Sequence, residues 1–72
     1  MNKAEFLEEF IEVLQTEEEI DENTVLEELE EWDSLSKMAT IAFLDKNFSI
    51  KVTFDEIKNF KTVQDIIDKA GI

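Results

Sequence analysis

The chain reads EWDSLSKM at residues 31–38, where an acidic, turn-forming run gives way to an apolar helical run. Asp33 stands where an N-cap residue belongs, which places Ser34 and Leu35 in the first turn of the helix that follows. A serine hydroxyl there lies near solvent, and a phosphate attached to it would sit at the positive end of the helix beside unpaired backbone N–H groups. Ser34 is therefore either a helix-start residue alone or a site for a phosphate-bearing group.

Residues 34–48 predict a long helix, because their apolar positions recur every three or four residues. These positions are Leu35, Met38, Ile41, Leu44 and Phe48, and the apolar surface is widened by Ala39, Ala42 and Phe43. A chain of 72 residues does not cover such a helix on every side. We therefore predict a docking surface formed by Leu35, Met38, Ala39, Ala42 and Phe43, with some of these side chains facing solvent.

Capping patterns mark the starts of the other predicted helices. Asn2 with Glu5 opens a first amphipathic helix. Three further pairs follow the same pattern: Thr24 with Glu27 before a short helical turn, Thr53 with Glu56 before a short helix, and Thr62 with Asp65 before a last helix. Gly71 follows the last helix as its C-terminal cap.

The connecting segments hold few apolar residues, which are expected to point into the core. Ile20 is the one apolar residue of the acidic loop at residues 16–23, and Ile50 and Val52 lie in the connector at residues 47–52. The predicted fold class is all-α: a three- to four-helix antiparallel bundle with a long acidic first loop. We expect residues 1–72 to form this bundle as a single domain.

The composition excludes several kinds of chemistry. The chain has no Cys and no His, which removes zinc sites of the Cys/His kind, disulfides and Ser-His-Asp triads. Ser34 is thus expected to be modified by another enzyme, and no catalytic residue is predicted. Residues 1–10 lack the basic and apolar regions of a signal peptide, and no apolar run approaches the length of a membrane span. These features predict a cytoplasmic protein.

Charge is unevenly distributed along the chain. Nineteen acidic and seven basic residues give a net charge of −12. Residues 1–33 carry fourteen acids and one lysine, which sum to −13, and residues 34–72 carry five acids and six lysines, which sum to +1. Nucleic acids and anionic membranes would repel such a chain, so we expect neither as a partner. The expected partners are proteins with basic patches, and the expected oligomeric state is a monomer.

The acidic loop invites comparison with a calcium-binding loop. Residues 21–23 open loosely like an EF-hand loop, but no glycine stands at the sixth position. We therefore predict no metal site. Weak and diffuse binding of divalent ions stays open as an alternative.

With these features the chain resembles the acyl carrier protein family, the phosphopantetheine-binding carriers. The tripeptide Asp-Ser-Leu at residues 33–35 starts the second helix and follows Trp32. A short helix at residues 54–58 comes next, and Thr-Val-Gln-Asp-Ile at residues 62–66 opens the last helix. The resemblance covers nearly the whole chain.

This resemblance implies a function and a site. Ser34 would receive a 4′-phosphopantetheine arm from coenzyme A through a phosphopantetheinyl transferase acting with magnesium. The thiol of the arm would carry acyl, aminoacyl or peptidyl groups as thioesters. Asp33 would position the serine and the magnesium-bound phosphate, and Leu35 and Met38 match partner-contact positions. The implied partners are the transferase and the acyl-loading and acyl-transferring enzymes of fatty-acid, polyketide or related biosynthesis; the carrier itself is not a catalyst.

The chain departs from the best-known fatty-acid carriers at helix 34–48. Trp32 stands where those carriers tend to have a small residue, and Asp45 is the only acid in a helix that is acidic in them. We therefore expect docking to be more apolar and less electrostatic, as in a dedicated carrier of a specialised pathway. The six phenylalanines are also expected to fill space in which fatty-acid carriers shelter a long chain.

Two other interpretations stay open beside the carrier. The first is an unmodified helical interaction module that binds through the apolar face of residues 34–48, which Met38→Ala or Phe43→Ala would weaken. The second is an acidic divalent-ion buffer, which would bind calcium saturably with a defined stoichiometry. Only a carrier would be labelled by a transferase and coenzyme A and lose that labelling on Ser34→Ala.

Overall fold

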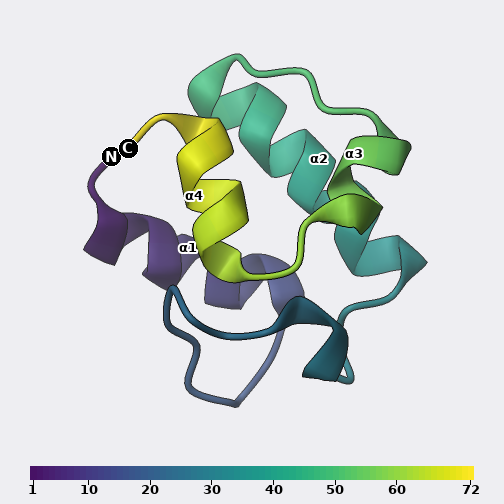
Figure 1. The fold of residues 1–72 in the computed structure, drawn as a ribbon. Helices are drawn as coiled ribbons and strands as arrows, with labels where there is room; N and C mark the ends of the chain where they lie inside the picture. The colour runs from purple at the N-terminus through teal and green to yellow at the C-terminus, as the bar shows by residue number, and fades with distance from the viewer.

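Four α-helices and one short 3₁₀ turn make up the computed structural model, which describes residues 1–72 (Figure 1). The elements are α1 (Lys3–Leu14), the 3₁₀ turn η1 (Leu26–Glu28), α2 (Ser34–Phe48), α3 (Phe54–Asn59) and α4 (Val63–Ala70). The predicted all-α bundle with a long first loop is confirmed, and the number of α-helices is four. No helix combines the length and the apolar character that a membrane span requires.

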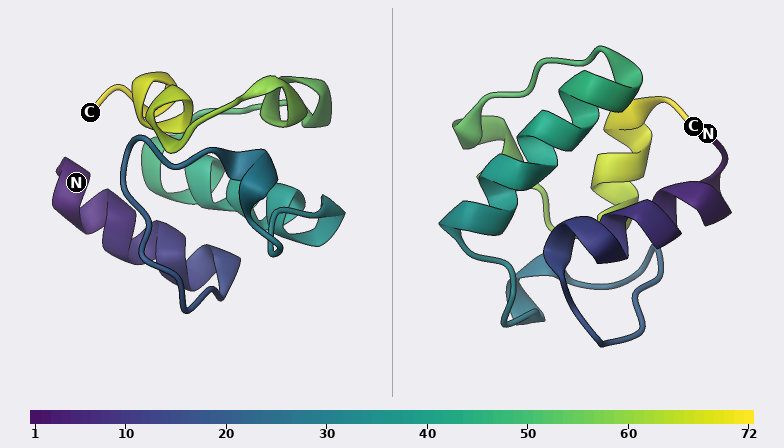
Figure 2. Two further views of the ribbon diagram at one scale, coloured as in Figure 1. Left: turned by 60° about the horizontal axis from the view of Figure 1, so that its bottom comes forward. Right: turned by 180° about the vertical axis from the view of Figure 1, so that it is seen from behind.

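Helix α2 lies between α1 on one side and the layer of α3 and α4 on the other (Figure 2, left). It packs against both α1 and α3. The two ends of the chain lie at the same side of the molecule (Figure 1). The first turn of α2, which begins at Ser34, follows the long loop directly.

Reciprocal capping bonds start the helices where the sequence predicted them. The Asn2 side chain accepts from the backbone N–H of Glu5 at 2.8 Å, and the Glu5 carboxylate accepts from the backbone N–H of Asn2 at 3.0 Å. The corresponding bonds between Thr53 and Glu56 measure 3.1 and 3.4 Å. At the start of α4 the Asp65 carboxylate accepts from the Thr62 backbone at 3.1 Å. Each bond satisfies an N–H that the helix itself leaves free.

The predicted capping box of Thr24 and Glu27 is wrong. The 3₁₀ turn has Val25 as its N-cap residue, and no side chain caps it. The Thr24 hydroxyl instead accepts from the backbone N–H of Asp21 at 3.0 Å. The reason is tertiary: the Thr24 carbonyl accepts from the N–H of Val63 at 3.1 Å, because this part of the loop pairs with the start of α4.

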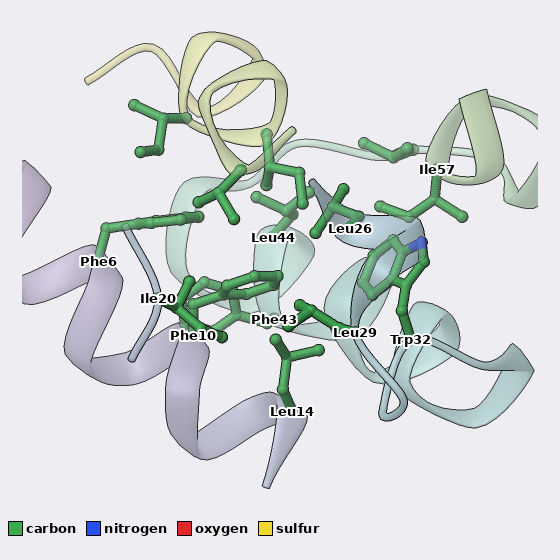
Figure 3. Close-up of a cluster of buried hydrophobic side chains, with 14 residues drawn as sticks. Phe6, Phe10, Leu14, Ile20, Leu26, Leu29, Trp32, Phe43, Leu44 and Ile57 are labelled. Atoms are coloured by element: carbon green, nitrogen blue, oxygen red, sulfur yellow. The ribbon is translucent and has the colours of Figure 1, made fainter. Parts of the chain in front are cut away.

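Fourteen buried apolar side chains form the core, and rings join α1 to the rest of the fold (Figure 3). Phe6 stacks on Phe10 with 5.7 Å between ring centroids and contacts Phe43 at 5.6 Å. Phe10 meets the edge of Trp32 at 6.3 Å. Such aromatic contacts add to the stabilisation that burial provides.

The expected inward residues of the connecting segments are confirmed. Ile20 and Val52 are buried in the core, and Ile50 packs against it. The prediction that Phe43 belongs to the docking surface is wrong: its side chain is 7% exposed and contacts the rings of Phe6 and Phe48. Because α1 covers this side of α2, Phe43 belongs to the core.

Candidate functional site

A double hydrogen bond builds the first turn of α2. The Asp33 carboxylate accepts from the backbone N–H of Ser36 at 2.9 Å, and the Ser36 hydroxyl oxygen accepts from the backbone N–H of Asp33 at 2.9 Å. The Ser36 hydroxyl also donates to the backbone carbonyl of Glu31. Asp33 is therefore the N-cap that the sequence predicted. Sequence reasoning missed the part played by Ser36, because the usual capping-box signature has Glu or Gln, not Ser, three residues after the N-cap.

The same bonds set the charge of Asp33. The hydrogen bond from the Ser36 backbone holds the pKa of the Asp33 carboxyl below its usual value, since it favours the ionised form. Asp33 is thus a carboxylate at neutral pH. Its negative charge lies at the N-terminus of α2, where the helix dipole is positive, and it therefore stabilises the helix.

Ser34 is the first residue of α2 and is exposed. Its hydroxyl takes no part in the capping bonds, which Asp33 and Ser36 make between them. The structure therefore leaves the Ser34 hydroxyl open to a modifying enzyme. A phosphate on it would lie at a helix N-terminus, where backbone N–H groups and the dipole favour an anion.

A groove of about 460 Å³ opens beside Ser34, which we call the α1–α2 groove. Its lining comes from the end of α1 and from the start of α2 with the loop before it: Val13, Leu14, Gln15, Glu31, Asp33, Leu35, Ser36 and Ala39. Both chain neighbours of Ser34 are among these residues. An exposed hydroxyl, a helix N-terminus and an adjoining groove fit a flexible arm attached through a phosphate.

Exposed apolar side chains follow α2 from the same end. Leu35 is 78% exposed and Met38 is 59% exposed. Ala39 and Ala42 are also exposed, so the structure brings four of the five predicted docking residues to the surface of α2 and takes Phe43 away from it. Exposed large apolar side chains next to one another are typical of interaction sites.

An acidic hollow of about 560 Å³ adjoins the α1–α2 groove and shares Gln15 and Glu31 with it. The rest of its lining consists of glutamates from the segment between α1 and α2: Glu17, Glu18, Glu28 and Glu30. No group of three or more of these side chains is arranged to hold a metal ion.

Comparison with known proteins gives the family. The chain matches the family described as "Phosphopantetheine attachment site" over residues 4–69. The chain therefore belongs to this family of phosphopantetheine-binding carriers. Its domains are carriers rather than catalysts, and their cofactor is 4′-phosphopantetheine, held covalently.

Two curated relatives are acyl carrier proteins. Those of Myxococcus xanthus and Micrococcus luteus are each 42% identical to the chain over 36 residues. The matched segment is 50% of this chain and 46% and 44% of those proteins, so the chain spans about half the length of the curated relatives that it matches. No solved structure matches the chain.

Proposed function

We propose that Ser34 carries the 4′-phosphopantetheine arm and that the chain shuttles thioester-linked groups between enzymes. The observation that carries the proposal is the exposed Ser34 hydroxyl at the N-terminus of α2, which takes no part in the capping bonds that Asp33 and Ser36 make with each other. A phosphopantetheinyl transferase would attach the arm from coenzyme A. The chain has no cysteine, so the arm supplies the thiol that the chemistry needs.

Partner enzymes dock, in this proposal, on Leu35, Met38, Ala39 and Ala42. These residues surround the attachment point, so an enzyme that contacts them also reaches the arm. Helix α2 has one acid, Asp45, and two lysines, Lys37 and Lys46, so it offers a basic patch little to bind. Docking should therefore rest on apolar contact, with charge contributing mainly to the rate of encounter.

The cargo is proposed to be that of a dedicated pathway related to fatty-acid or polyketide biosynthesis. The aromatic side chains of Phe6, Phe10 and Phe43 fill the space between α1 and α2 (Figure 3). No phenylalanine lines any of the three surface hollows. A long acyl chain would have to displace packed rings, which favours short or partner-held cargo.

Intact-protein mass spectrometry tests the attachment. The protein is incubated with a broad-specificity transferase, coenzyme A and magnesium, and we expect one phosphopantetheinyl group per chain. Ser34→Ala should abolish the gain in mass. Ser49→Gly is the matched control, because Ser49 is an exposed serine at the other end of α2 whose φ of 56° suits glycine. Wild-type protein that stays unmodified with two unrelated transferases would contradict the proposal.

A second candidate function is an unmodified interaction module, favoured by the exposure of Leu35 and Met38. The kinetics of modification by a transferase distinguish the two functions. If α2 docks a transferase, Met38→Ala should lower kcat/KM for modification by about tenfold, the effect of a contact worth about 1.4 kcal/mol. Val25→Ala, which truncates an exposed apolar residue away from α2, should leave it unchanged. Partner binding that ignores Ser34→Ala, in protein that no transferase modifies, would favour the module.

A further inference from the structure

Lys37 stands apart among the basic residues, because it is the only one between residues 4 and 45. The acids Glu30, Glu31 and Asp33 come shortly before it in the chain. Lys37 nevertheless forms no ion pair, since the three ion pairs of the structure involve other lysines. Its positive charge therefore has no anionic partner within the protein, although acids surround it in the sequence.

The ring of Trp32 holds the Lys37 ammonium in place. The ammonium lies over this ring, 5.8 Å from its centroid. Trp32 is itself buried, and Phe10 meets the edge of its ring at 6.3 Å. The face of an indole attracts a cation but accepts no strong hydrogen bond from it. The contact therefore positions the ammonium and leaves its N–H groups available to an anion.

Helix geometry places Lys37 next to Ser34. The two residues are three positions apart in α2, so their side chains are neighbours on one face, with about 5–6 Å between Cβ atoms. Side chains of a helix also lean towards its N-terminus. Lys37 leans in this direction, because its ammonium contacts Trp32, which precedes α2. A phosphate on Ser34 would therefore be within reach of the Lys37 ammonium.

The charges around Ser34 make such a cation useful. A phosphate there would add negative charge beside the carboxylate of Asp33, and the N-terminus of α2 offsets only a part of it. Lys46, the other lysine of α2, lies nine residues after Lys37, about 13 Å further along the helix axis. Within α2, Lys37 is thus the one full positive charge close to the attachment point.

We propose that Lys37 is the counter-ion of the phosphate that is transferred to Ser34. The inference rests on the proposed function. In the transfer, the Ser34 oxygen bonds to the phosphorus that carries pantetheine, and the phosphoanhydride bond of coenzyme A breaks. Adenosine 3′,5′-bisphosphate leaves, and the hydroxyl proton passes to a base of the transferase. Lys37 exchanges no proton; its ammonium donates to the phosphate oxygens during the transfer and in the diester that results.

The ³¹P resonance of the modified protein tests this pairing. Wild type, Lys37→Met and Lys46→Met are each modified, and mass spectrometry first establishes one phosphopantetheinyl group per chain. We expect the resonance of Lys37→Met to be displaced from that of wild type and the resonance of Lys46→Met to coincide with it. Methionine retains a flexible apolar stem that packs well against an aromatic ring, so Lys37→Met mainly removes the charge. Coinciding resonances in all three proteins, or equal displacements in both variants, would overturn the inference and leave the proposed function standing.

The kinetics of modification give a second measure. Lys37→Met should lower kcat by about tenfold and leave the KM for the carrier unchanged, because the ammonium contacts the phosphate and not the transferase. Lys37→Arg should retain most of the wild-type kcat, since a guanidinium also binds phosphate and stacks on aromatic rings. Lys46→Met, which makes the same change of charge on the same helix, should leave both constants unchanged.

Other results would assign Lys37 a different part. A raised KM with unchanged kcat in Lys37→Met would make Lys37 a docking contact and overturn the inference. An unchanged kcat with a lower melting temperature of the unmodified variant would make it only a support of Trp32, which also overturns the inference. The same holds if Lys37→Arg is modified as slowly as Lys37→Met. Wild-type protein that gains no phosphopantetheinyl group would overturn the proposed function, and the inference with it.

Discussion

Residues 1–33 and residues 34–72 hold their charges in opposite ways. The first region carries −13 and takes part in no ion pair, whereas the second carries +1 and contains all three ion pairs of the structure. The pairs are Asp45–Lys51 at 3.8 Å, Asp55–Lys58 at 3.3 Å and Glu56–Lys69 at 3.2 Å. The second region is thus balanced within itself, while the first carries unbalanced negative charge and is held to the second by apolar contacts and by backbone hydrogen bonds.

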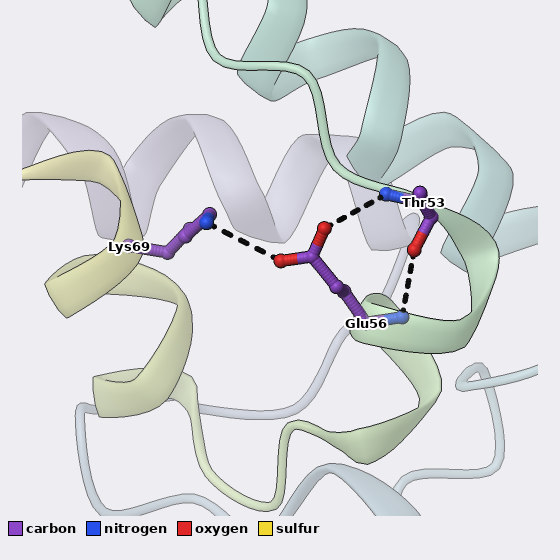
Figure 4. Close-up of polar contacts among 3 residues, drawn as sticks. All are labelled: Thr53, Glu56 and Lys69. Carbon is purple, nitrogen blue, oxygen red and sulfur yellow. Dashed lines mark hydrogen bonds and ion pairs between the residues drawn. The ribbon is translucent and has the colours of Figure 1, made fainter.

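Glu56 shows how the balanced region uses a charge (Figure 4). One carboxylate oxygen accepts from the backbone N–H of Thr53 at 3.4 Å, and the other meets the Lys69 ammonium. A single side chain therefore caps α3 and ties it to α4. No acid of residues 1–33 has such a cationic partner, and the one lysine of that region, Lys3, forms no ion pair either.

The largest effect is expected from weakening the apolar contact between the two regions, which we call the joint and which Phe6 makes with α2. Phe6 is fully buried and contacts Phe43 and Phe48 of α2, so Phe6→Ala should cost about 3–5 kcal/mol of the free energy of unfolding. That is a large share of the roughly 5–15 kcal/mol of a native domain. Urea denaturation measures the loss. Phe54→Ala, at a side chain that is 40% exposed, should cost about 1 kcal/mol or less; equal losses would contradict the assignment of the joint.

The next effect concerns self-repulsion in the first region. Raising the ionic strength from low to moderate should stabilise the fold by about 1 kcal/mol, which raises the melting temperature of a domain of this size by roughly 4–8 °C. The reason is that 0.1 M salt screens charges more than about 10 Å apart, and the acids of the first region repel one another. Magnesium should act at lower concentration than sodium. A melting temperature that stays flat over this range would refute the role given to repulsion.

A matched pair of variants places this repulsion. The double variant Glu17→Gln with Glu30→Gln removes two negative charges from the acidic hollow. The double variant Asp45→Asn with Asp55→Asn removes two negative charges from residues 34–72, the balanced region. At low salt the first pair should raise the melting temperature and weaken its salt dependence. The second pair should not raise it, because it breaks two ion pairs. Equal shifts would mean that net charge alone matters.

A smaller effect depends on pH. The hydrogen bond and charge of Lys69, with the backbone bond from Thr53, lower the pKa of Glu56 from the ordinary 4.5. A lowered pKa in the folded state stabilises the protein above the unfolded value and loses that contribution as the pH falls through the folded one. Wild type should therefore be more stable than Glu56→Gln at neutral pH, and the difference should vanish below the lowered pKa. Thermal unfolding at several pH values measures it, and Lys69→Met should shrink the same difference.

The smallest effect is expected at the outermost ion pair. Lys51 and Asp45 are 3.8 Å apart with highly exposed side chains. Such pairs contribute little, so Lys51→Ala should change the free energy of unfolding by about 0.5 kcal/mol or less. A larger loss in urea denaturation would show that ion pairs support the second region more than their geometry suggests.

The spacing of capping residues predicted most helix starts. The prediction failed for Thr24 and Glu27, because Thr24 pairs with a distant part of the chain. The capping bonds of Asn2 with Glu5 and of Thr53 with Glu56 involve residues three apart, so they form wherever those residues begin a helix. Thr24 has the same spacing to Glu27, yet its carbonyl accepts from Val63, far along the chain. Nothing near residue 24 in the sequence indicates that bond.

The candidate site divides in the same way. The sequence indicated Ser34, the N-cap Asp33 and the exposed Leu35 and Met38. A helix start is visible in the local pattern, and so is an apolar surface too wide to be buried on every side. It did not distinguish Phe43 from Met38, since both are apolar residues of one helix. It also missed the α1–α2 groove, because three of its eight lining residues come from residues 13–15, far from Ser34 in the sequence.

The sequence by itself determined the helices, their caps, the charge asymmetry and the serine at the start of α2. These properties depend on neighbours within one or two turns and on composition. Only the tertiary structure decided which face of α2 is covered, where the loop pairs with α4 and over which ring the Lys37 ammonium lies. Those outcomes depend on where α1 packs, and that position follows from the joint fit of side chains far apart in the sequence.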